Sequence, residues 1–351
     1  MKRRPLHSRC PCGAVDVHTH VVPARFPHYA GGRGAEPRWP TMVEVDACHR
    51  SVVIEDRVFR TVPSDSWDPA VRTGQIADRG LAHQVLSPMP ELLSYWLEPA
   101  DGEAMCRFLN DFIAGLAAHD LGRFTGLGAV PLQDMDAAIR VLEHAASTLG
   151  LAGVEVASHV NGTPVGHPSF QPFFEAAQAL DMVVFVHALR PTGLERLVGP
   201  AALEYALGYP TEVGLAAASM ITGGTLARFP RLRVAFSHGA GTLGQMLPRL
   251  EHAWNVLPGF RVEGGPSPRE LARRMFVDDL VYDGQAIRHL VDLFGPTQLM
   301  LGSDYPFAIQ DPDPVGRLAT AGLDPATHSA VLRDNALRWI DGPHQHTVSG
   351  D

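Results

Sequence analysis

The sequence predicts an α/β protein folded as a (β/α)8 barrel, in which helices surround a closed sheet of eight parallel strands. Eight short apolar runs rich in β-branched residues recur along the 351 residues, and most precede a stretch with helical apolar spacing. Strands that alternate with helices form a parallel sheet, and eight of them favour a closed barrel over an open sheet. No GxGxxG motif follows a strand, which argues against a nucleotide-binding fold.

The predicted elements follow one another in a regular order. The expected strands are AVDVH (14–18), HQVLSP (83–88), FTGLGAV (124–130), GVEVAS (153–158), MVVFVH (182–187), LRVAFSH (232–238), MFVDD (275–279) and QLMLGSD (298–304). The expected helices lie within 103–119, 136–148, 170–180, 210–229, 242–255 and 286–294. With 45% hydrophobic residues the chain can bury one large core, so we place a single barrel domain at residues 14–340.

The segment between about residues 21 and 82 is too long for a simple loop between strand and helix. It contains VEVDACHRSVVIEDRVFRTV (43–62), whose alternation predicts a small antiparallel insertion over the barrel mouth. Arg60 in this insertion is expected to point into the site. Residues 1–13 and 341–351 are expected to be a flexible lead and a flexible tail.

Composition narrows the class of protein. The net charge of −9 argues against nucleic acid and anionic membranes as partners, and no apolar run approaches the ~20 residues that span a bilayer. The basic N-terminal stretch has no apolar segment behind it, unlike a secretory signal. Four cysteines (Cys10, Cys12, Cys48, Cys106) are too few for a disulfide framework. Cys10 and Cys12 could bind a metal as a CxC pair, but we interpret them as free thiols. A cytoplasmic protein is expected.

Lysine is nearly absent, since Lys2 is the single lysine of the chain. This excludes a Schiff-base lysine, a pyridoxal-phosphate lysine, a P-loop lysine and a carbamylated bridging lysine from the body of the protein. The chemistry must therefore use histidine, carboxylates, arginine, tyrosine, serine or a metal.

Five residues of metal-ligand type fall at the ends of predicted strands. His18 and His20 end the first strand, His187 the fifth, His238 the sixth and Asp304 the eighth. The carboxyl ends of barrel strands meet at one face, where barrel enzymes build their active sites. Three imidazoles and a carboxylate suit a divalent ion, with Zn²⁺ favoured over Mn²⁺ or another ion, and leave a position for water.

Four motifs at these positions match a known family. They are HTH (18–20), FVH (185–187), FSHGAG (236–241) and LGSDYPF (301–307). On them the sequence resembles the amidohydrolase superfamily, and more narrowly the branch typified by 2-amino-3-carboxymuconate-6-semialdehyde (ACMS) decarboxylase. Four further segments follow the pattern of that branch: 59–72, 85–96, 129–138 and 229–241. The resemblance runs from about residue 14 to 340 and implies the metal-dependent hydrolase type of barrel.

The resemblance implies a role for each of the five strand-end residues. His18, His20, His187 and Asp304 become the ligands of one metal, with Asp304 also counted in the catalytic centre. His238 becomes the acid/base that activates water at the metal. This division agrees with general chemistry, because a metal lowers the pKa of bound water and a histidine can carry its proton.

Two arginines are implied as substrate-binding cations. In this family the counterparts of Arg60 and Arg249 hold substrate carboxylates, and that of Arg249 reaches the active site of a neighbouring subunit in a homodimer. Arginine binds carboxylates through two parallel hydrogen bonds, which suits this role. From the residues alone, the alternatives are that Arg60 is a solvated loop cation and that Arg249 pairs with Glu251 or another acid on its helix, and for Arg60 the functional role is favoured.

The chain departs from the family after the third metal histidine. ACMS decarboxylase has Pro-Trp-Asp there, whereas this chain has Ala-Leu-Arg-Pro at 188–191, and its segment 194–212 contains no tryptophan. Loops over the metal determine which substrate fits. We therefore expect a different substrate, a pocket with fewer bulky aromatic side chains, and a further anion contact from Arg190. His159 either lines the pocket or is an ordinary loop residue.

These features predict a metal-dependent, non-oxidative decarboxylase that acts on a small unsaturated or aromatic carboxylic acid without an organic cofactor. The alternative is a hydrolase or hydratase of a lactone, amide or enoic acid that uses the same site. A non-catalytic metal-binding or ligand-binding protein is a third hypothesis. It is disfavoured because the ligands, the base and the anion-binding arginines are all present.

Overall fold

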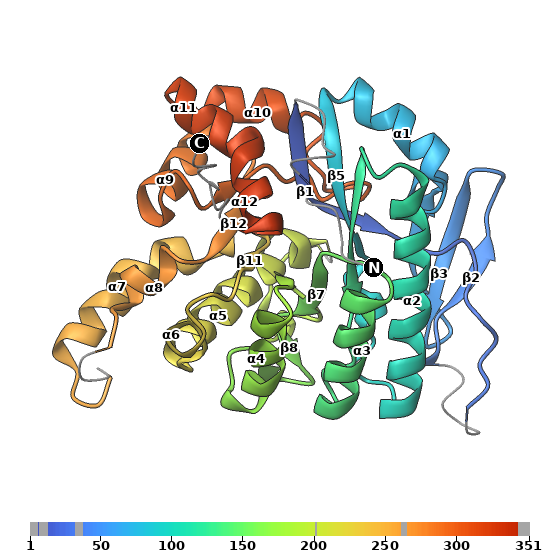
Figure 1. The fold of residues 1–351 in the computed structure, drawn as a ribbon, viewed down its shortest axis with the longest axis horizontal. Helices are drawn as coiled ribbons and strands as arrows, with labels where there is room; N and C mark the ends of the chain where they lie inside the picture. Colours follow the sequence, from blue (N-terminus) through green and yellow to red (C-terminus); the bar gives the residue numbers. More distant parts are fainter. Residues whose placement is uncertain (1–5, 7–12, 32–37, 201, 261–264, 343–351) are drawn as a thin grey trace, which may run out of the picture.

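All eight predicted strands are present in the computed structural model, which describes residues 6, 13–31, 38–200, 202–260 and 265–342. They form one parallel sheet in the order β1-β5-β6-β7-β10-β11-β12-β13 (Figure 1). Their bounds are β1 Ala14–Val21, β5 Leu81–Pro88, β6 Phe124–Ala129, β7 Gly153–Ala157, β10 Val183–His187, β11 Val234–Phe236, β12 Phe276–Asp278 and β13 Leu299–Met300. The predicted succession of strands is confirmed.

Backbone hydrogen bonds between the first and last strands close the sheet into a barrel. The N–H of Val17 donates to the carbonyl of Leu301 at 2.9 Å, and the N–H of Asp304 donates to that of His18 at 2.8 Å. The N–H of His20 donates to the carbonyl of Tyr305 at 2.7 Å. Closure therefore occurs at the strand ends that carry the predicted ligands, and the predicted barrel is confirmed.

Helices follow the strands on the outside of the barrel. They are α1 Pro69–Asp78, α2 Pro99–His119, α3 Met135–Ser147, α4 Gln171–Ala179, α5 Tyr209–Thr222, α6 Thr225–Arg228, α7 Leu243–Val256, α8 Pro268–Ala272, α9 Gly284–Phe294, α10 Pro314–Thr320, α11 Pro325–Ser329 and α12 Asn335–Asp341. The one helix expected at 210–229 is divided into α5 and α6. The break lies at Gly223 and Gly224, because Gly224 adopts a φ of +81° and Gly223 packs against the backbone of Gly166.

The long segment between β1 and β5 contains a three-stranded antiparallel sheet. Its strands are β2 Thr41–Glu44, β3 His49–Ile54 and β4 Arg57–Pro63, and Figure 1 shows it at the right edge of the molecule. Val52 and Val62 point inward and are fully buried, whereas most of β2 and β4 is exposed. This one-sided burial explains the alternation in the sequence. Arg60 lies on β4.

A separate apolar cluster fills the amino-terminal end of the barrel. It joins strand residues such as Val15, Val17 and Phe185 to Trp339 of α12, whose ring lies 6.1 Å from that of Phe185. Leu6 also belongs to this cluster, and its N–H donates to the carboxylate of Asp341 at 2.8 Å. The rest of the expected flexible lead, up to residue 12, lies outside the described residues, as do residues 343–351 of the expected tail.

Cys48 is exposed and Cys106 is buried, and both are free thiols. Cys10 and Cys12, for which we weighed a metal-binding CxC pair, lie outside the described residues. Within the described part of the chain, none of the helices has the length and apolar character needed to cross a bilayer.

Replacement of Trp339 by alanine is expected to destabilise the protein by about 3–5 kcal/mol, because a fully buried indole ring leaves a cavity beneath the strands. Urea denaturation of the two proteins measures this difference. Glu143→Ala, at an exposed position on α3, is the control and is expected to change stability by less than about 0.5 kcal/mol. Equal stabilities of the Trp339 variant and the control would contradict the importance of this cluster.

Candidate metal centre

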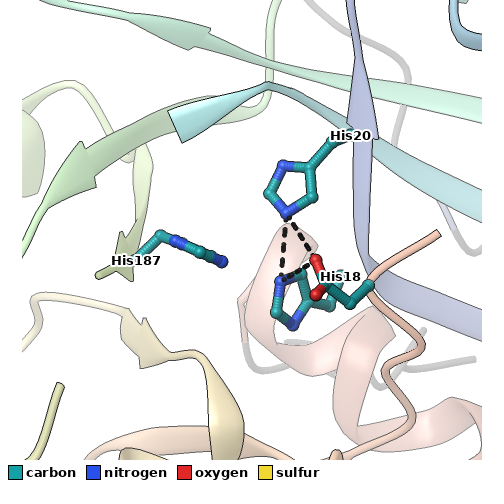
Figure 2. A group of neighbouring side chains, drawn as sticks. His18, His20 and His187 are labelled. Atoms are coloured by element: carbon teal, nitrogen blue, oxygen red, sulfur yellow. Dashed lines mark hydrogen bonds and ion pairs between the residues drawn. The ribbon is translucent and has the colours of Figure 1, made fainter. Parts of the chain in front are cut away.

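Four buried side chains converge where β1, β10 and the segment after β13 meet. His18, His20, His187 and Asp304 each offer one donor atom, and these four atoms lie within 4.8 Å of one another. Nε2 of His18 and Nε2 of His20 are 3.1 Å apart. Oδ1 of Asp304 lies 3.4 Å from the first of these nitrogens and 3.1 Å from the second. Figure 2 shows the three histidine rings converging on one point.

The other nitrogen of each histidine ring is held by an oxygen. Nδ1 of His18 lies 2.7 Å from the carboxylate of Asp278, Nδ1 of His20 lies 3.0 Å from the carbonyl of Pro88, and Nδ1 of His187 lies 2.8 Å from the carbonyl of Ala188. Each Nδ1 therefore donates its proton, which leaves the lone pair of Nε2 toward the centre. Among the described residues, Nε2 of His187 is buried without a hydrogen-bond partner. These donors fit a divalent cation.

The pKa values of the donor residues also favour the binding of a cation. Burial lowers the pKa of His187 well below its usual range, and the neighbouring imidazoles lower it further. Burial alone raises the pKa of Asp304, but its pairing with His20 and the charge on His18 outweigh this effect and hold the pKa at about 2. For His18, burial lowers the pKa, and the opposing contacts with Asp278 and other carboxylates raise it to about 9, so without a metal this ring holds a proton that a bound cation would displace. The centre therefore attracts positive charge strongly.

His238 follows β11 and lies beside the four donors without being one of them. Its ring centroid is 5.2 Å from that of His18 and 5.0 Å from that of His187. Its backbone has a φ of 53°, in the left-handed region, where non-glycine residues are strained. The carboxylate of Asp278 accepts hydrogen bonds from the N–H groups of His238 and Gly239 at 3.0 and 2.9 Å and so stabilises this conformation.

A cavity of about 580 Å³ opens in front of the centre. His187, His238 and Asp304 line it together with Arg60, which reaches it from β4. The guanidinium of Arg60 lies 4.0 Å from the ring centroid of Phe307 and 5.7 Å from that of Tyr205. It forms no ion pair among the described residues. An arginine in this state has its hydrogen-bond donors available for an anionic ligand.

Several residues of the cavity wall were missed by the sequence analysis, among them Glu91, Tyr205 and Tyr209. The loop without tryptophan contributes two tyrosines to the wall, so aromatic side chains are present there. The two tyrosine rings stack with centroids 5.5 Å apart. The hydroxyl of Tyr209 donates to Glu91 at 3.2 Å. Glu91 belongs to the segment 85–96, which follows the pattern of the family, but the sequence of that segment does not indicate that Glu91 faces a cavity.

Arg190 and His159, both predicted to bind substrate, are placed outside the lining of this cavity. The guanidinium of Arg190 lies 3.5 Å from the ring centroid of Trp96. His159 donates from Nε2 to the carbonyl of Arg190 at 3.1 Å and accepts the N–H of Gly162 at Nδ1 at 3.0 Å. The two hydrogen bonds of His159 fix the loop after β10, and the guanidinium of Arg190 packs on Trp96. The competing partner, Trp96, lies far away in the sequence, so the pattern of the loop could not show it.

Arg249 is exposed on α7 and does not line the cavity of its own chain. The alternative pairing with Glu251 is not found among the described residues, where the carboxylate of Glu251 accepts the N–H of Arg269 at 2.9 Å. Figure 1 shows α7 extending away from the strands at the lower left. Within its own chain, Arg249 thus lies apart from the cavity that His187, His238, Asp304 and Arg60 line.

Known proteins share this architecture. Residues 15–341 match the family model described as Amidohydrolase. The ACMS decarboxylase of Dictyostelium discoideum is 34% identical and covers 93% of this chain and 91% of its own length.

Two solved structures share the fold. IDCase of Metarhizium anisopliae has a TM-score of 0.79 at 19% identity, with 94% of this chain and 97% of that chain covered. The dihydroxybenzoic acid decarboxylase of Polaromonas, solved with bound manganese, has a TM-score of 0.70 at 18% identity and covers 93% and 96%. The chain belongs to the amidohydrolase family, and within it to the branch typified by ACMS decarboxylase.

Proposed function

We propose that this protein is a metal-dependent, non-oxidative decarboxylase of an unsaturated or aromatic carboxylic acid. The observation that carries the proposal is the arrangement of one cavity, in which a cation-binding centre, a histidine beside it and an unpaired arginine face the same space. Its relatives support it, since the curated relative that is 34% identical is named a decarboxylase. Hydrolysis or hydration by the same centre is the alternative, which the isotope experiment below separates.

Each residue of the cavity has a task in this reaction. Arg60 binds a substrate carboxylate through its free guanidinium hydrogens. A divalent cation held by His18, His20, His187 and Asp304 supplies a Lewis acid for a substrate oxygen. The bond between the carboxylate and its carbon breaks, CO₂ leaves, and the electron pair stays on the substrate carbon. This carbon takes up a proton that His238 passes to it from water, so no oxidant or organic cofactor is required.

We infer that the cation is Zn²⁺ or Mn²⁺. Three imidazole nitrogens and one carboxylate oxygen suit both ions, with zinc favoured by the nitrogen-rich set. Manganese is supported by the Polaromonas enzyme, whose structure contains it.

We also assign the protein to the cytoplasm. Free Cys48 and Cys106 suit the reducing conditions of that compartment.

We further propose a homodimer in which Arg249 enters the active site of the partner subunit. Arg249 is exposed and lies on a helix with solvent-facing apolar side chains, including Met246 and Val256, at 56% exposure each. Exposed apolar side chains of this size are typical of surfaces that bind another chain. A second arginine in the cavity would bind a second anionic group of the substrate.

The decarboxylation itself is tested by isotope labelling. Metal-loaded protein is incubated with ACMS and with a panel of unsaturated and aromatic acids in heavy water and in ¹⁸O-labelled water. We expect release of CO₂ and one solvent deuterium at the carbon that lost the carboxylate, with no labelled oxygen in the organic product. Labelled oxygen in that product would instead identify hydrolysis or hydration.

His238→Asn provides the matched control for this experiment. The variant is expected to lose turnover while it keeps a full equivalent of metal, because His238 is not among the four donors. Turnover equal to that of the wild type would exclude His238 as the proton donor.

Asp278→Asn is expected to weaken metal binding by roughly 10–100-fold, because the variant loses the charged acceptor that fixes the ring of His18. Competition with a chelator measures the affinity. Asp279→Asn is the matched control, since Asp279 accepts the N–H of Gly302 and, in the described part of the chain, forms no hydrogen bond with any of the four donor residues. Equal losses in both variants would indicate a general effect of removing a buried carboxylate.

The shared active site is tested by mixing subunits. Arg249→Ala and His238→Asn chains are expected to be inactive alone. Mixed dimers of the two contain one complete site, so an equal mixture is expected to regain about a quarter of the wild-type rate. A monomer in sedimentation, or no recovery in mixed dimers, would contradict the role of Arg249.

A further inference from the structure

Glu91 is a buried carboxylate that faces the cavity with one oxygen unpaired. It lies in the short turn Pro90–Leu93 after β5, is 3% exposed and lines the same cavity as His187 and His238. Oε1 accepts the hydroxyl of Tyr209. Oε2 is buried and has no hydrogen-bond partner among the described residues. A buried carboxylate oxygen without a partner is costly, so its retention calls for a function.

The nearby arginine does not explain Glu91 as half of an ion pair. Arg60 and Glu91 line the same cavity, yet their side chains form no ion pair within 4.0 Å in the described part of the chain. Burial raises the pKa of Glu91, and the positive charge of Arg60 partly opposes this effect. The two groups are therefore close enough to influence each other, while each keeps hydrogen-bonding capacity for a ligand.

An aromatic wall connects the metal centre to Glu91. The ring of His20 stacks on Phe307 with centroids 4.9 Å apart, and the guanidinium of Arg60 lies over Phe307. Tyr205 lies next to the guanidinium and stacks on Tyr209, whose hydroxyl reaches Glu91. A planar conjugated ligand packs well against such a wall. The wall thus has a cation-binding end, an anion-binding arginine, and an acidic end.

We propose that Glu91 is a specificity-determining residue whose free oxygen accepts a hydrogen bond from an amino or hydroxyl group of the substrate. This inference rests on the proposed function, and it assigns the recognition of that donor group to Glu91. A substrate donor restores the missing partner of Oε2. A group without a hydrogen, or a second carboxylate at that point, leaves the oxygen unpaired or repels it.

The test measures binding, so it does not depend on turnover. The probes are benzoate and the ring isomers of aminobenzoate, hydroxybenzoate and methoxybenzoate, titrated calorimetrically into metal-loaded protein. We expect one amino or hydroxy isomer to bind about tenfold more tightly than benzoate and than the methoxy compound of the same isomer, as a hydrogen bond to a charged group predicts. Equal affinities across the isomers would overturn the proposal.

Three variants separate Glu91 from its surroundings. The Glu91→Leu variant is expected to bind benzoate as the wild type does. It is expected to bind the selected amino or hydroxy isomer no more tightly than benzoate. Glu91→Gln keeps the shape and presents an amide hydrogen, so the preference is expected to shift toward the methoxy compound. Gln245→Leu removes another polar side chain of the cavity lining and is expected to keep the wild-type preference.

The outcomes distinguish this inference from the proposed reaction. A preference for donors that survives in Glu91→Leu, or that disappears in Gln245→Leu alone, would overturn the role of Glu91. If Glu91→Leu does not fold, the shift in Glu91→Gln decides the question. A Glu91-dependent preference in a protein that releases no CO₂ would support the role of Glu91 and reject the proposed decarboxylation. Release of CO₂ without this preference would support the decarboxylation and reject the role of Glu91.

Discussion

The carboxylate of Asp278 connects the two halves of the active site. One of its oxygens lies 2.7 Å from Nδ1 of His18, and the same group accepts the backbone N–H of His238 and of Gly239. It therefore orients a metal-binding imidazole and, at the same time, stabilises the left-handed backbone that presents His238 to the cavity. Because both tasks fall on one buried group, the positions of the cation and of the proton donor relative to each other are fixed by the end of β12.

Barrel closure provides the other constraint. The hydrogen bonds that join β1 to the segment after β13 involve the backbones of His18 and Asp304 themselves, so the same contacts that complete the sheet bring two donors together. The amino-terminal end is packed by Trp339 and other apolar side chains, and the polar groups are concentrated at the opposite end. Stability and chemistry thus occupy different ends of one barrel, as is general for this fold.

The sequence predicted what depends on local periodicity. Eight apolar runs identified the strands, and their last residues identified His18, His20, His187, His238 and Asp304 as neighbours in space. What depends on contacts between distant segments was not predictable in this way. Arg190 is paired with Trp96 and His159 with the backbone of its own loop, although both looked available in the sequence. The break between α5 and α6 likewise arises from the approach of Gly223 to Gly166.

The loop that departs from the family shows how chemistry and specificity separate in this protein. This loop lacks tryptophan, and Tyr205 and Tyr209 supply the aromatic rings that reach from the cavity to Glu91. The metal centre lies on strand ends, where a substitution disturbs barrel closure, and is therefore constrained by the fold itself. Tyr205 and Tyr209 lie on a loop and at a helix start, where a substitution changes what the cavity accepts without touching the strand ends. A new substrate preference can therefore arise in the wall while the centre that performs the reaction stays unchanged.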